Sequence, residues 1–121
     1  MARLGDLERQ VMEILWAGFG SELTGRDVAA RLPGHAYTTV LTVLGRLEHK
    51  GLVRRERSHT THRYAAIETR EAYVAEVMHE ALEGTSDRDA ALVRFAQTVS
   101  GREAGVLRRA LERSEKGRPP R

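Results

Sequence analysis

The chain has 121 residues, 40% of them apolar and 31% charged, which allows one small domain with an extension but not two full globular domains. It has no cysteine, which excludes a disulfide framework and any thiolate metal site, and no apolar run approaches the roughly 18 residues of a membrane span. The N-terminal segment is too charged for a signal peptide and the formal net charge is only +3, so we expect a cytoplasmic protein without membrane insertion, in which the distribution of charge matters more than its total.

The first 50 residues predict three helices. Apolar residues at helical spacing predict the first over 4–17, with glycines at 18 and 20 to end it. Thr24, followed three residues later by Asp27, predicts a capping box that opens a short second helix, which the Pro-Gly pair at 33–34 ends. A third helix is predicted over 36–50, with an apolar side made by Val40, Val43, Leu44 and Leu47.

A basic β-hairpin is predicted after the third helix. Residues 52–57 and 62–66 have the composition of strands, and the polar residues 58–61 between them make the tip. Residues 46–63 carry six cations against two carboxylates, a net charge of +4, whereas residues 67–121 carry ten of each. Three helices followed by a basic hairpin is the arrangement of a winged helix, and the local charge excess is typical of a phosphate-facing surface.

Helical spacing returns from Thr69, with a second helix starting at Asp87 and a third opened by the capping-box pair Ser100 and Glu103. The fold class is therefore mainly α with a small β-hairpin. We expect a winged-helix DNA-binding domain over 1–67, a helical dimerisation domain over 68–116 and a disordered tail over 117–121. These C-terminal helices have no predicted core of their own, so we expect a partner subunit to bury their apolar side chains, namely Tyr73, Val77, Leu82, Leu92, Phe95, Val99, Val106, Leu107 and Leu111.

The side of the third helix opposite its apolar stripe is predicted to read DNA. Thr38, Thr42 and Gly45 give it lean side chains that fit a major groove, where a threonine methyl can pack on a thymine methyl. A glycine within a helix costs about 1 kcal/mol relative to alanine, so Gly45 indicates either a close backbone approach or a tolerated surface position. Arg46 lies on the flank of this face and is expected to bond guanine or phosphate.

The hairpin and the residues next to it supply further candidates. Four arginines flank the tip and are expected to straddle a neighbouring backbone or minor groove, namely Arg54, Arg55, Arg57 and Arg63. Tyr37 either bonds a phosphate or covers the core. His59 and His62 have no acidic or thiolate companions nearby, so we expect no metal and no cofactor.

The chain resembles the BlaI/MecI family of penicillinase and methicillin-resistance repressors over about residues 4–112. The resemblance is carried by the first helix from Leu4 to Trp16, by YTTVLTVLGRL at 37–47 with KGLV at 50–53, by HRY at 62–64, and more weakly by ALVRF at 91–95. It implies a transcriptional repressor, not an enzyme, that binds a palindromic operator as a homodimer whose C-terminal helices exchange between subunits. It also implies control of antibiotic-resistance or cell-envelope stress genes.

Site residues follow from the resemblance by position. The family's DNA contacts fall on Thr38, Thr39, Thr42 and Arg46 and on the wing. The full set of expected DNA-binding residues is then Tyr37, Thr38, Thr39, Thr42, Gly45, Arg46, Arg54, Arg55, Arg57, His62 and Arg63. Leu41 departs from members that have arginine there. Some members are inactivated by a membrane sensor protease that cuts between asparagine and phenylalanine, and the matching bond here is Arg94–Phe95, with arginine in place of asparagine.

Two other kinds of winged helix remain as alternatives. A ligand-sensing regulator would hold a pocket between its domains, which leaves little trace in a sequence. A module that binds only proteins would carry an apolar or acidic third-helix face, which the threonines and arginines disfavour. No nucleophile–base set and no glycine-rich phosphate loop supports an enzyme.

Overall fold

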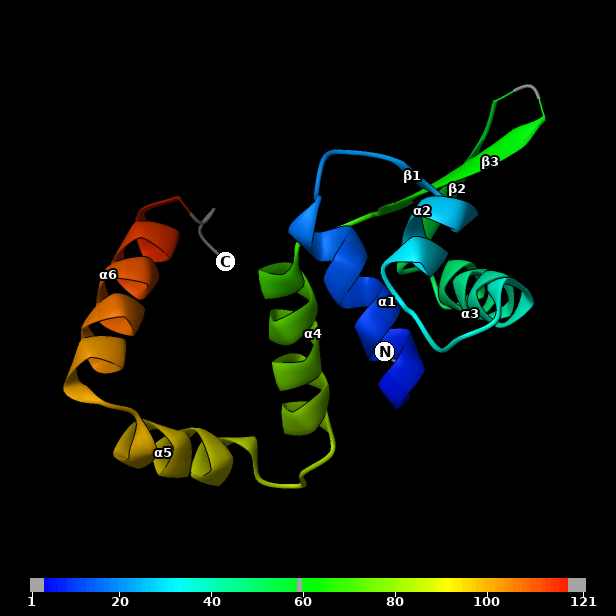
Figure 1. Cartoon of the computed structure of the whole chain (residues 1–121). Helices are drawn as coiled ribbons and strands as arrows, with labels where there is room; N and C mark the ends of the chain where they lie inside the picture. Colours follow the sequence, from blue (N-terminus) through cyan, green and yellow to red (C-terminus); the bar gives the residue numbers. More distant parts are fainter. Residues whose placement is uncertain (1–3, 59, 118–121) are drawn as a thin grey trace. The chain divides into compact units, whose positions relative to one another are not determined.

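The structure is a computed structural model that describes residues 4–58 and 60–117. The elements follow one another as α1 (Asp6–Ala17), β1 (Leu23–Thr24), α2 (Gly25–Ala30), α3 (Tyr37–His49), β2 (Val53–Ser58), β3 (Thr61–Ala66), α4 (Arg70–Glu83), α5 (Arg88–Thr98) and α6 (Gly101–Gly117) (Figure 1). The chain divides into two compact units, Met1–Glu80 and Ala81–Arg121, so the division falls within α4. The predicted fold class is confirmed.

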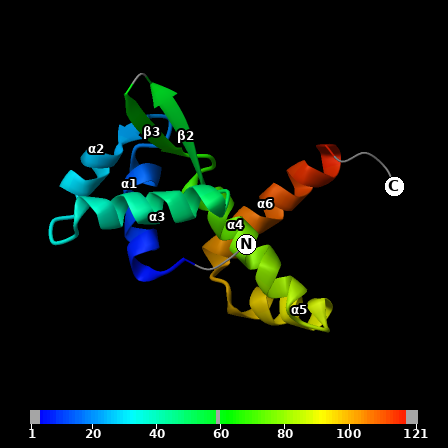
Figure 2. The same cartoon turned by 90° about the vertical axis from the view of Figure 1, so that its right-hand side faces the viewer.

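The first unit is built around the apolar sides of α1 and α3. Val11, Met12 and Leu15 from α1 meet the α3 stripe Val40, Val43, Leu44 and Leu47, and each of these is at most 4% exposed. Burying such side chains contributes about 1.5–3 kcal/mol each, which accounts for the regular spacing of the stripe. The hairpin of β2 and β3 extends away from the three helices, and α3 runs below it (Figures 1 and 2).

The sheet has three strands in the order β1-β3-β2, all antiparallel. The two-residue strand β1 pairs Leu23 with Tyr64 and Thr24 with Arg63, and no sequence pattern predicted it. Two residues are too short to show an alternating pattern, and β1 is a strand only because the chain between α1 and α2 passes the free edge of β3. The extra strand fixes the base of the hairpin against α2.

Helix starts match the predicted capping signals. The Thr24 hydroxyl accepts the Asp27 N–H at 3.1 Å while the Asp27 carboxylate accepts the Thr24 N–H at 3.0 Å, and these bonds hold the pKa of Asp27 below its ordinary value. Ser100 and Glu103 make the same reciprocal pair at the start of α6, at 3.0 and 3.1 Å. Asp87 caps α5 by accepting the Ala90 N–H at 3.0 Å.

The helices after the hairpin differ in how far they are covered. Tyr73 on α4 is 7% exposed and packs on Trp16, with ring centroids 5.3 Å apart, so the start of α4 belongs to the first core. Tyr73 is thus covered by the first unit itself and does not need a partner subunit to bury it. By contrast, α5 contains no buried residue. No helix within residues 4–58 and 60–117 is both long enough and apolar enough to cross a bilayer.

Candidate DNA-binding surface

The outer face of α3 is open to solvent, as the sequence predicted. Thr38, Thr39, Thr42, Gly45 and Arg46 are all exposed, while the four apolar residues on the opposite side are buried. The Thr42 hydroxyl donates to the Thr38 carbonyl oxygen at 3.0 Å. That bond uses the only donor of the hydroxyl, so Thr42 offers its methyl group and an acceptor to anything that approaches.

Gly45 lies in open space. A β-carbon added there would meet no heavy atom within 4 Å, so the packing of the protein itself does not require glycine at this position. Glycine in a helix interior nevertheless costs about 1 kcal/mol relative to alanine. The space beside this backbone is thus available to an external partner.

A different glycine, Gly25, sets how closely α2 packs on α3. A β-carbon at Gly25 would lie 2.7 Å from Cδ2 of Leu41 and 3.4 Å from Cε1 of Tyr37. Leu41 is half-buried and packs against the core, so its side chain is shared between the interior and the outer face. Leu41 is therefore held in place by α2.

Thr39, Thr42 and Arg46 line one wall of a hollow of about 370 Å³. The other wall comes from the start of α1, at residues 5–8. The structure thus brings together three of the predicted DNA contacts, from successive turns of α3, beside the N-terminal end of another helix. The positive end of the α1 dipole and Arg46 favour a phosphate or an acceptor-rich base edge at this hollow, against the negative charges of Asp6 and Glu8 on its other wall, of which Glu8 is paired with Lys50.

An ion pair fixes the end of α3 against the start of α1. Both carboxylate oxygens of Glu8 accept from Lys50 Nζ, at 2.7 and 2.8 Å, and one of them accepts the Gly5 N–H at 2.8 Å. Glu8 is only 8% exposed, and the Lys50 ammonium together with the Gly5 N–H holds the pKa of the Glu8 carboxyl below its ordinary value. Lys50 follows the last residue of α3, so this pair constrains the angle at which α3 presents its outer face.

Two wing arginines are paired within the chain. Arg54 Nη1 lies 3.3 Å from Glu22 Oε2 and 3.0 Å from Glu56 Oε1, and Arg55 Nε lies 3.5 Å from Glu48 Oε2. These pairs are partly exposed, so each contributes only about 0–1 kcal/mol, but a phosphate must displace a carboxylate to reach either arginine.

The remaining wing arginines are differently placed. Arg57 and Arg63 are exposed and have no ion pair within the part of the chain that the structure describes. Arg63 sits opposite Glu56 in the strand register, and Arg57 sits opposite His62. These two arginines are the better candidates for phosphate contact on the wing.

Arg26 is a residue that the sequence did not single out. Its guanidinium lies 4.8 Å from the centroid of the Tyr37 ring, over the first residue of α3. Tyr37 is 38% exposed, so it contributes to the surface as well as covering Gly25. Only the packing of α2 on α3 brings Arg26 and Tyr37 together, and no sequence motif in either helix predicts this contact.

Of the two histidines on the hairpin, only His62 lies in the described part of the chain. His62 is half-buried, and its Nδ1 has no hydrogen-bond partner among the described residues. His59 lies outside the described residues. Within residues 4–58 and 60–117 no group of three or more histidine, aspartate or glutamate side chains could hold a metal ion.

The residues predicted for dimer contact fall into three groups. Tyr73 is buried in the first unit, and Val77 packs against the same core. Leu82 and Val99 are half-buried. The others are exposed to between 39% and 55%, and they are Leu92, Phe95, Val106, Leu107 and Leu111. Arg94 and Phe95, the candidate cleavage position, are exposed in the middle of α5.

The fold and this surface define a winged-helix protein of the DNA-binding class. The chain also matches the family model of the penicillinase repressor over residues 4–113. It is 46% identical over 129 aligned positions to the transcriptional regulator BlaI of Mycobacterium tuberculosis, in strains CDC 1551 / Oshkosh and ATCC 25618 / H37Rv, covering 99% of this chain and 93% of each relative. The chain therefore belongs to the penicillinase repressor family, whose members are DNA-binding transcriptional repressors and not enzymes.

Solved structures agree on the fold. A MarR family protein from Bacillus stearothermophilus superposes with a TM-score of 0.51 at 21% identity, covering 96% of this chain and 76% of that one. The G34K mutant of MepR from S. aureus gives a TM-score of 0.50 at 18% identity, covering 94% and 79%. At these identities the similarity concerns the winged helix and C-terminal helices alone.

Proposed function

We propose that the protein represses transcription as a homodimer on an inverted-repeat operator. One α3 from each subunit enters successive major grooves about 34–36 Å apart, so the spacing of the half-sites follows from the dimer. Because its ligand is double-stranded DNA, the protein works in the cytoplasm. The observation that carries this proposal is the bare outer face of α3, with three threonines, a glycine in open space and Arg46 beside them.

The residues of the α3 reading face each have a role in this arrangement. Thr38, Thr39 and Thr42 contact base edges or phosphates, and Gly45 lets the helix backbone approach the groove. Arg46 bonds guanine or a phosphate. Arg57 and Arg63 neutralise phosphates beyond the reading helix, aided by Tyr37 at its start and by His62 on the hairpin. Arg54 and Arg55 join them by exchanging their carboxylate partners for phosphates.

The dimer is supported by apolar side chains that have no cover within the second unit. Six of them on α5 and α6 are 39–58% exposed, namely Leu92, Val93, Phe95, Val106, Leu107 and Leu111. Some border a groove of about 490 Å³ formed by the end of α5 and the start of α6. Exposed apolar side chains in this number on so small a unit are typical of a protein–protein contact, and a second copy of the same helices is complementary to them.

The test is a double substitution on the reading face. Thr42→Ala with Arg46→Ala is expected to weaken specific operator binding by roughly 30- to 20,000-fold, since two good base contacts at about 1–3 kcal/mol each contribute about 2–6 kcal/mol. Sedimentation is expected to show an unchanged dimer. Arg9→Ala with Gln10→Ala is the control, because it removes an exposed arginine and an exposed polar side chain from α1 that belong to neither the reading face nor the dimer groove. Unaltered operator binding by the first variant would count against the proposed reading face.

Release from DNA is a separate proposal, which rests on family resemblance and on the position of one bond. We infer that a membrane sensor protease cuts Arg94–Phe95. The bond lies within α5, so α5 must unwind locally before a protease can bind it as an extended segment. The cut would detach α6 and its apolar residues from the DNA-binding unit. Induced cells should then accumulate a fragment ending at residue 94, whereas derepression with an intact chain would favour the ligand-sensing alternative.

A further inference from the structure

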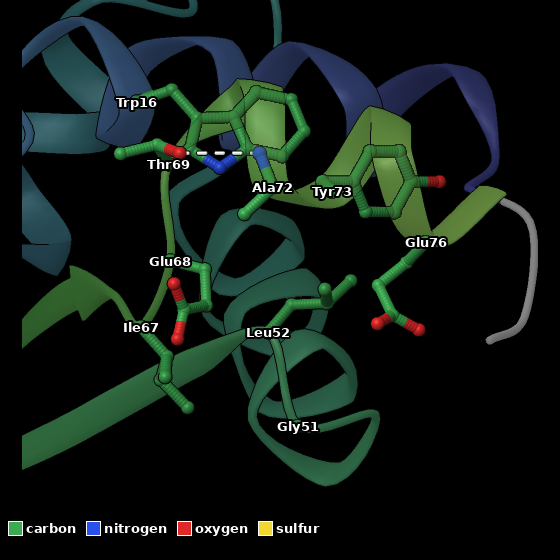
Figure 3. A pocket seen from close by; sticks show the side chains of 9 residues that line it. All are labelled: Trp16, Gly51, Leu52, Ile67, Glu68, Thr69, Ala72, Tyr73 and Glu76. Atoms are coloured by element: carbon green, nitrogen blue, oxygen red, sulfur yellow. Dashed lines mark hydrogen bonds between the residues drawn. The ribbon is translucent and has the colours of Figure 1, made fainter. Parts of the chain in front are cut away.

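A cavity at the base of the hairpin takes no part in the DNA-binding surface. Its volume is about 380 Å³, which lies within the range of small-molecule sites, about 300–1,000 Å³. Its walls come from the end of α1, the turn that follows α3, the segment between β3 and α4, and the first two turns of α4 (Figure 3). All of these belong to the first unit.

The floor of the cavity is aromatic and apolar. Trp16, Tyr73 and Leu52 line it, and each is at most 8% exposed. The two aromatic rings are tilted by 41° with centroids 5.3 Å apart. The Trp16 ring already has a cation near it, because the Arg70 guanidinium lies 5.9 Å from its centroid. Arg70 does not line this cavity, whereas Trp16 and Tyr73 do, with 8% and 7% of their surfaces exposed.

Two carboxylates stand at the rim. Glu68 and Glu76 are exposed, and Figure 3 shows their carboxylates on either side of Leu52. Neither has a hydrogen bond or an ion pair among the described residues. Nearby cations are engaged elsewhere, since Lys50 binds Glu8 and Arg70 binds Glu13. The rim thus carries two uncompensated negative charges in a chain whose formal net charge is +3.

We propose that this cavity binds an organic cation with an aromatic body, such as an aromatic amine or diamine. The aromatic part packs against Leu52 and the parts of Trp16 and Tyr73 that line the cavity, and an ammonium group near a ring face is attracted by its negative charge distribution. The ammonium groups pair with Glu68 and Glu76 at the rim. An anion of the same shape is repelled by both carboxylates, and a neutral molecule of that shape cannot form either ion pair, so both should bind more weakly than the cation.

The fluorescence of Trp16 provides a direct assay, because it is the only tryptophan in the chain. The probe is 1,4-xylylenediamine, with the neutral 1,4-benzenedimethanol and the dianion 1,4-phenylenediacetate as matched controls. The full-length protein is expected to bind the diamine about ten-fold more tightly than the diol at low salt, and to bind it more weakly as salt increases. Equal binding of diamine and diol, or no saturable change with the diamine, would overturn the proposal.

Two substitutions place the binding at the rim. Glu68→Gln and Glu76→Gln are each expected to weaken diamine binding by roughly two- to five-fold, the range of an exposed ion pair. The double variant should bind the diamine no better than the diol. Glu71→Gln, on the same helix but outside the cavity, should leave the diamine affinity unchanged. Retention of full diamine affinity by a folded double variant would contradict the assignment.

Operator binding separates this inference from the proposed function. Glu68 and Glu76 are not part of the α3 surface, so both variants are expected to bind the operator with unchanged affinity when the diamine is absent. Failure of diamine binding therefore leaves the α3 assignment intact, and failure of the α3 variants leaves the cavity assignment intact.

Discussion

Replacing Gly45 with alanine should affect stability and DNA binding in opposite directions. The added methyl group meets no heavy atom of the chain within 4 Å, so it causes no strain in the folded protein. Alanine has less backbone freedom than glycine in the unfolded chain and therefore loses less entropy when the helix forms. This difference stabilises the fold by about 0.5–1 kcal/mol. For a domain of this size that corresponds to an increase in melting temperature of roughly 2–6 °C. The same methyl group occupies space that we assign to the wall of the major groove, so operator affinity should fall by about ten-fold, or 1.4 kcal/mol.

Thermal unfolding followed by circular dichroism and operator binding followed by fluorescence anisotropy measure the two effects on the same samples. Gly101→Ala at the start of α6 is the control, because a β-carbon there also meets nothing within 4 Å. It should not weaken operator binding. If Gly45→Ala binds the operator as tightly as the parent, the α3 backbone does not approach DNA at this point. If Gly45→Ala lowers the melting temperature, the added methyl group strains the folded protein, and the inference that Gly45 lies in open space is wrong.

Three further results are expected. Arg57→Gln and Arg63→Gln should each reduce the slope of log affinity against log salt by about 0.9, the effect of one lost phosphate contact. The same substitution at the ion-paired Arg54 or Arg55 should reduce the slope by less. Equal reductions for all four variants would contradict this ranking. Glu8→Gln should destabilise the fold at neutral pH by roughly 1.5–3 kcal/mol, the range for a hydrogen-bonded charged group. In the folded protein the pKa of Glu8 is lowered from 4.5, so the Glu8 carboxylate contributes stability above the unfolded pKa and loses that contribution as pH falls through the folded pKa. When unfolding free energy is measured against pH, the variant should therefore lose less stability than the parent below about pH 4.5. Leu107→Glu should yield a monomer that binds the operator weakly, while Lys116→Glu, half a turn around α6 at 100° per residue, should remain dimeric in sedimentation.

Local signals in the sequence were sufficient for most of the elements. The capping pairs Thr24 with Asp27 and Ser100 with Glu103 act across three residues, so the structure reproduces them directly. The exposed face of α3 follows from helical periodicity in the same way. Strand β1 did not follow, because its identity depends on the edge of β3 about 40 residues later and on nothing within its own two residues.

Charge was the part of the site that the sequence described least well. Counting along residues 46–63 gives a net charge of +4, but carboxylates from outside that segment reach into it. Glu8 binds Lys50 across 42 positions and Glu22 binds Arg54 across 32. Tertiary packing thus leaves fewer unpaired cations than the local count implies, and it decides which of them can meet a phosphate.

The tight packing of Gly25 against Leu41 limits how this repressor can be retargeted. A designer who wished to change operator preference through position 41 would be choosing a side chain that must also fit under α2, where a β-carbon on residue 25 would come within 2.7 Å of the present leucine. Libraries that vary position 41 should therefore keep glycine at 25 and include α2 neighbours. Positions 25 and 41 are expected to tolerate change as a pair and to resist it singly.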